Sequence, residues 1–117
     1  MPKQTDDRPE GFLPLHPFDL RILLALTEGP AHGYPIIKAI EAKEGSWKRV
    51  LPANLYRRLR ELSSRGLVVE VEAKDVPDDD RARRTFALSK LGRRVAIAET
   101  RRLEALVADA RSALRKA

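Results

Sequence analysis

Residues 52–66 read PANLYRRLRELSSRG. The pattern predicts a helix that starts at the proline and stops at the glycine, because proline is tolerated in a first turn and glycine suits the residue after a helix end. Three leucines share one face at spacings i, i+4 and i+7: Leu55, Leu59 and Leu62. At 100° per residue, Arg57 and Arg60 lie on the opposite face. We therefore expect one side of this helix to enter a core and the other to present guanidinium groups.

The composition narrows the class of protein. The chain has 117 residues, which suits one domain, and 23 basic against 17 acidic residues give a formal charge of +6. It has no cysteine, so disulfides, thiolate metal sites and cysteine nucleophiles are excluded, and a cytoplasmic location is expected. With two histidines and no glycine-rich phosphate loop, the sequence predicts no enzyme, no metal and no other cofactor. The basic balance favours a polyanionic partner.

The remaining segments give their own secondary-structure signals. Apolar periodicity predicts a helix at 18–27 and a second that ends at Glu44, and strand-like runs at 67–71 and 85–88 flank a long polar turn. A final helix is expected from its N-cap, Ser89, almost to the C-terminus. We expect a mainly α fold with a small β-hairpin (α+β), in three parts. These are a flexible or loosely docked proline-rich tail at 1–17, a winged helix domain at 18–88 and a C-terminal dimerisation helix at 89–117.

Three helices followed by a hairpin form a winged helix, whose third helix enters the DNA major groove while the hairpin touches the flanking backbone. The segment 48–65 carries six basic residues and one acid, and more arginines begin the second strand. We therefore predict a sequence-specific regulator of transcription that binds double-stranded DNA. The residues expected to contact it are Lys38, Lys48, Arg49, Ala53, Asn54, Arg57, Arg58, Arg60, Arg81, Arg83 and Arg84.

Two helices indicate a second copy of the chain. The helix at 18–27 is apolar almost all round and needs two apolar neighbours. A final helix of almost thirty residues would span about 40 Å, longer than a domain of about 100 residues can cover. The expected dimer contacts are Leu20, Leu23, Leu24, Leu103, Leu106, Val107, Ala110, Ala113 and Leu114.

Several blocks of the sequence together match a known family. They are Ile22 to Leu26, Gly29 to Tyr34, Asn54 to Leu62, Gly66 to Val68 and Arg81 to Gly92. The combination, which covers residue 18 to the end, resembles the PadR-type transcriptional regulators, and the single C-terminal helix is similar to their short subgroup. The resemblance implies a homodimeric winged-helix repressor that binds a palindromic operator and is released by a small-molecule inducer.

The resemblance also implies that Tyr34 and Tyr56 contact the DNA backbone, although both could equally be core rings with their hydroxyls at the surface. Arg57 stands where the family commonly has proline, which adds a charge to the DNA face. Pro35 stands where an acidic residue often follows the tyrosine. Residues 89–117 contain no aromatic side chain, so the aromatic ligand pocket of some short members is not expected here.

Other functions fit parts of the sequence. A winged-helix protein-interaction module would present the same basic face to an acidic partner and would prefer no DNA sequence. A basic amphipathic C-terminal helix could bind a membrane surface, but its apolar side lacks Trp and Phe. We expect His32 to be structural, Trp47 to pack over the domain and the acidic run 78–80 to be solvated and not metal-binding.

Overall fold

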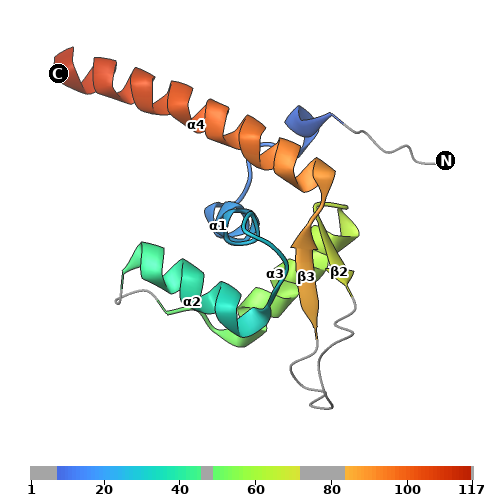
Figure 1. Ribbon diagram of the computed structural model, residues 1–117. Coiled ribbons are helices and arrows are strands. Elements are labelled where there is room, and N and C mark those ends of the chain that lie inside the picture. The colour runs from blue at the N-terminus through green and yellow to red at the C-terminus, as the bar shows by residue number, and fades with distance from the viewer. Residues whose placement is uncertain (1–7, 46–48, 72–83, 117) are drawn as a thin grey trace.

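The computed structural model describes residues 8–45, 49–71 and 84–116. Helices α1, α2 and α3 form a layer below the long helix α4, and a small sheet closes one end (Figure 1). The predicted mainly helical winged-helix fold with a long C-terminal helix is confirmed. In chain order the elements are the 3-10 helix η1 (Pro9–Phe12), α1 (Pro17–Ala25), β1 (Ala31–His32), α2 (Gly33–Glu44), α3 (Pro52–Ser64), β2 (Val68–Val71), β3 (Thr85–Leu88) and α4 (Lys90–Lys116).

The leucine stripe of α3 lies at the centre of the core. Leu55 and Leu59 have no exposed surface and Leu62 is 1% exposed, as the spacing predicts. They belong to one core that also contains apolar side chains from α1, α2, α4 and the sheet. Burial of each such side chain stabilises the fold by roughly 1.5 to 3 kcal/mol, so a rotation of α3 that exposed the stripe would be costly.

The sheet contains one strand more than the sequence predicts. The strand order is β1-β3-β2, and both pairings are antiparallel. The additional strand, β1, has two residues, too few to show the alternation by which a strand is predicted. Its His32 pairs with Thr85, and the two side chains are also joined by a hydrogen bond of 2.9 Å between Nδ1 and Oγ1. His32 is therefore structural, as expected.

The start of α4 is fixed against the end of α3. The Oγ of Ser89 accepts a hydrogen bond of 2.8 Å from the backbone N–H of Gly92, which confirms the predicted N-cap, and donates one of 2.7 Å to the carbonyl of Gly66. Gly92 lies so close to the carbonyl of Leu67 that a Cβ there would collide with it. The glycine allows the first turn of α4 to pack directly on the connection between α3 and β2.

Residues 8–16, the part of the expected flexible or loosely docked tail that the structure describes, are docked on the domain. Helix η1 packs against α4, and Leu15 is 5% exposed. The guanidinium of Arg65 lies 5.2 Å from the centre of the Phe12 ring, which ties the segment to the end of α3. These partners come from distant parts of the chain, so the local proline content gave no sign of them.

A buried carboxylate completes this docking. Glu99 is 2% exposed, and it accepts a 3.2 Å hydrogen bond from the backbone N–H of Leu15 and two from Arg102, at 2.7 and 2.9 Å. The hydrogen bonds from Arg102 lower the pKa of Glu99 below its ordinary value against the opposing effect of burial, and the Leu15 N–H lowers it further. Because the folded pKa is the lower one, the stabilisation is complete above the unfolded value of about 4.3. It is lost as the pH falls through the folded pKa.

We expect Glu99→Gln to lower the free energy of unfolding at pH 7 by about 1 to 3 kcal/mol, because the amide loses the charge-assisted bonds to Arg102. Urea unfolding at pH 7, 5 and 3 should show the gap between wild type and variant narrowing as the wild-type carboxylate becomes protonated. Glu104→Gln, an exposed change on the same helix, serves as the control and should shift stability by less than about 0.5 kcal/mol. A gap that stays constant with pH would contradict this account.

Candidate nucleic-acid interface

The outer face of α3 carries the predicted contact residues. Ala53, Asn54, Arg57 and Arg60 are all exposed. The Nη2 of Arg57 donates a hydrogen bond of 3.3 Å to the Oδ1 of Asn54, so the two side chains lie together on the first turns of the helix. An arginine beside an asparagine offers donors suited to a guanine edge or a phosphate, and an amide suited to adenine.

Arg58 has a structural role that its neighbours lack. Its Nη1 lies 2.9 Å from the Oδ1 of Asp19 in α1, and the two side chains are 17% and 10% exposed. Its guanidinium also lies 5.5 Å from the centre of the Phe18 ring. Arg58 therefore joins α3 to α1, and its expected contact with DNA stays a prediction. The sequence gave no sign of this ion pair, because Asp19 lies 39 positions away.

The two tyrosines have different surroundings. Tyr34, in the first turn of α2, is 67% exposed, and the Nζ of Lys38 lies 5.5 Å from its ring centre. Tyr56 is half-buried and packs against the core, with its ring centre 6.4 Å from that of Phe86. Its hydroxyl lies where a Cβ of residue 33 would be, so this contact requires glycine at that position. Of the two alternatives, a ring packed in the core fits Tyr56. Tyr34 is exposed, so its ring can contact a partner.

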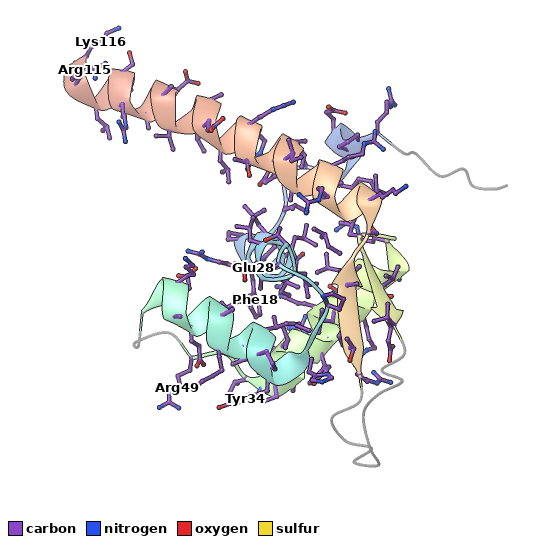
Figure 2. The ribbon with its side chains drawn as sticks, in the orientation of Figure 1. Phe18, Glu28, Tyr34, Arg49, Arg115 and Lys116 are labelled. Carbon is purple, nitrogen blue, oxygen red and sulfur yellow. The ribbon has the colours of Figure 1, made fainter. Side chains whose placement is uncertain are left out.

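The approach to α3 is held by α2. Glu41 accepts a hydrogen bond of 2.8 Å from the backbone N–H of Val50, next to the exposed Arg49. Tyr34 and Arg49 both lie on the side of the domain away from α4 (Figure 2). The structure thus brings the start of α2 and the approach to α3 to one side of the molecule. Lys48 lies outside the described residues.

The hairpin contributes one described arginine. The Nε of Arg84 lies 3.7 Å from the Oε2 of Glu70 across the β2–β3 pair, with the side chains 56% and 49% exposed. A pair so exposed contributes little to stability, so Arg84 can exchange this partner for a phosphate at small cost. Arg81, Arg83 and the acidic run 78–80 lie outside the described residues, as does Trp47.

The predicted dimer contacts divide into three groups by burial. Leu23 has no exposed surface, which removes it as a contact: α1 turns this side into the core of its own chain. Leu20 and Leu103 are half-buried. The others are exposed: Leu24, Leu106, Val107, Ala110, Ala113 and Leu114.

Some exposed apolar residues, Leu51 and Ile97 among them, were not predicted as contacts. Leu51, directly before α3, is 61% exposed, and Ile97 on α4 is 44% exposed. Leu24 and Ile97 line a cavity of about 270 Å³ between α1 and α4. In the sequence, the one sign of this for Leu51 is that an apolar residue stands directly before the proline that begins a helix.

No helix among residues 8–45, 49–71 and 84–116 is long and apolar enough to cross a bilayer.

A three-helix domain followed by a strand pair, with an exposed basic face on its third helix, defines the class of winged-helix DNA-binding proteins. The chain belongs to the PadR-like family of transcriptional regulators, whose profile matches residues 22–98. No protein with a curated description matches it at a significant level.

Solved structures share the fold. RosR of H. salinarum, in its complex RosR-S4, is 26% identical, with a TM-score of 0.64 over 93% of this chain and 99% of that one. A transcriptional regulator from Clostridium thermocellum is 19% identical, with a TM-score of 0.68 over 94% and 97% of the two chains. PadR of Bacillus subtilis, in complex with operator DNA, is 18% identical, with a TM-score of 0.61 over 73% of this chain and 47% of that one.

We expect the loss of Arg58 and the loss of Arg57 to have different effects on the free energy of unfolding. Arg58→Ala leaves the Asp19 carboxylate desolvated without its cation and should lower the free energy of unfolding by about 1 to 3 kcal/mol. Arg57→Ala removes an exposed side chain and should change it by less than about 0.5 kcal/mol. Chemical denaturation of the two variants beside the wild type makes the comparison, and equal losses would show that Arg58 does not support the fold in this way.

Proposed function

We propose that this PadR-family regulator is a repressor that binds an inverted-repeat operator as a homodimer and releases it when a small molecule binds. The observation that carries the proposal is the orientation of α3. Leu55 and Leu59 are fully buried, and Arg57 and Arg60 project from the opposite face. A helix held by one face and cationic on the other suits a major groove walled by phosphates.

The same side of the domain supplies the other proposed contacts. The ring of Tyr34 and the cations of Lys38 and Arg49 would position the domain on the DNA backbone, while Asn54 and Arg57 would meet base edges. Arg84 would hold the flanking phosphates from the hairpin. The Bacillus subtilis PadR structure, solved with operator DNA, supports this use of the fold.

The second half of α4 supports the dimer. The helix has 27 residues, and those it buries are Gly92, Val95, Ala96 and Glu99, all in its first ten positions. Beyond them the helix extends past the body of the domain (Figure 1). It carries an apolar stripe that includes Leu106, Val107 and Leu114, which are 53%, 49% and 74% exposed. Such a stripe favours packing against the same stripe of a second copy, with Leu24 of α1 beside it.

A dimer of this kind would present two copies of α3 to successive major grooves, about 34 Å apart along the duplex. The cavity between α1 and α4, with Leu24 and Ile97 in its lining, lies beside the proposed dimer contact. A small molecule held there would change the angle between the two domains and so the distance between the α3 helices. No aromatic residue lines this cavity, so a ligand would not be held by ring stacking. It would meet an apolar side formed by Leu24, Ala96 and Ile97, and polar or charged groups from Thr27, Arg93, Thr100, Arg101 and Glu104.

Selection from a random pool of DNA duplexes should enrich an inverted repeat. If the dimer neutralises about six to ten phosphates, its affinity for that sequence should fall by roughly three to five orders of magnitude between about 50 and 200 mM salt.

Arg57→Ala should weaken binding by about ten- to a hundredfold, which corresponds to roughly 1 to 3 kcal/mol. Arg115→Ala, at the far end of α4 (Figure 2), is the matched control and should bind like the wild type. An affinity that does not change with salt, or a pool from which no sequence is enriched, would refute sequence-specific DNA binding.

The double substitution Leu106→Glu and Leu114→Glu should give a monomer, because four carboxylates would meet in the proposed contact between the two α4 helices. Sedimentation equilibrium of the wild type and the variant measures this directly, and circular dichroism checks that the domain stays folded. Ala108→Glu adds a charge on the opposite face of α4 and should leave the dimer intact. A wild-type protein that sediments as a monomer would contradict the proposed assembly.

A further inference from the structure

An apolar edge lies at the start of α3, within an otherwise cationic surface. Leu51, Pro52 and Ala53 are consecutive and all exposed. Leu51 is 61% exposed, and among the large apolar residues that the structure describes only Tyr34 and Leu114 are more so. Exposed apolar residues that occur singly need no explanation, but three in succession at the tip of a DNA-reading helix form a contact surface of their own.

The backbone at this edge is held from both sides. The N–H of Val50 is bonded to the Glu41 carboxylate at 2.8 Å, and the carbonyl of Leu51 accepts the first helical hydrogen bond of α3, from the Leu55 N–H at 3.1 Å. Leu55 itself is fully buried. Leu51 is therefore an exposed side chain on a fixed backbone, which limits the ordering entropy that a contact would cost.

The chemistry of the edge points to a particular group on DNA. On the major-groove edges of the four base pairs the hydrogen-bonding groups are polar, and the apolar group is the C5-methyl of thymine. Pro52 has no N–H, so this turn of the backbone offers no donor to a phosphate at that position. The cations of Arg49 and Arg57 stand on either side of the edge along the chain, where phosphates would flank an apolar contact.

We propose that Leu51 contacts the C5-methyl of a thymine in each half-site and thereby selects a T·A pair at that position. This rests on the proposed function and adds a specificity-determining residue to it. The contact would cover the leucine side chain and the methyl together, and removal of one methyl from an apolar contact changes an affinity by about threefold to tenfold.

The test uses the enriched duplex, with each thymine replaced in turn by deoxyuridine, which removes the methyl and keeps the base pair. Fluorescence anisotropy of full-length wild-type protein should show a loss of about threefold to tenfold at one thymine per half-site. Leu51→Ala should bind the thymine and uracil duplexes equally at that position. Leu51→Met, which keeps an apolar side chain of similar volume, should retain most of the methyl preference.

Val69→Ala is the matched control, because it truncates another exposed apolar side chain, on β2, and should keep the full methyl preference of the wild type. The inference is overturned if every uracil duplex binds like the parent, or if Leu51→Ala keeps the preference at the same thymine. Either result would leave sequence-specific binding, and so the proposed function, intact. A pool from which nothing is enriched would overturn both.

Discussion

The burial of the α3 leucines is the constraint on which the rest of this protein depends. Leu55, Leu59 and Leu62 share one face, and the core accepts that face and no other. Their burial fixes the rotation of α3 about its axis, so the direction of Arg57 and Arg60 follows from apolar contacts on the far side of the helix. A site that recognises DNA needs side chains held on a rigid element, and here the rigidity comes from hydrophobic burial and not from the charges themselves.

The arginines of this basic chain fall into two sets, one partly buried in ion pairs and one exposed. Arg58 bonds Asp19 at 2.9 Å, and Arg21 bonds Glu44 at 2.6 Å, so these cations join α1 to α3 and to α2. Arg57 and Arg60 lie outside such pairs with acidic side chains and remain exposed. The net charge of +6 favours a polyanionic partner for the whole molecule, and the exposed arginines outside such pairs are the ones that we propose as its contacts.

The two halves of helix α4 have different surroundings. Its first ten residues are bound to the domain, where Gly92 permits the close approach to Leu67 and Glu99 holds the backbone of Leu15. The remaining turns carry the exposed apolar side chains of Leu106, Val107 and Leu114. Because a helix transmits orientation along its axis, the dimer contact that we propose for the far half would set the position of the winged-helix domain attached to the near half. A ligand beside α1 and α4 would act on that linkage.

Much of this fold follows from local pattern. The period of the leucines in α3, the proline and glycine at its ends and the β-branched runs of the hairpin act over a few residues, so the helices, the two longer strands and the exposed basic face could be predicted from the chain alone. Three other features could not be predicted from the chain alone: the strand at Ala31–His32, the docking of residues 8–16 and the pairing of Arg58 with Asp19. Each depends on groups that are dozens of positions apart and meet only when the core forms, and the complete burial of Leu23 likewise depends on which side of an almost uniformly apolar helix that core takes up.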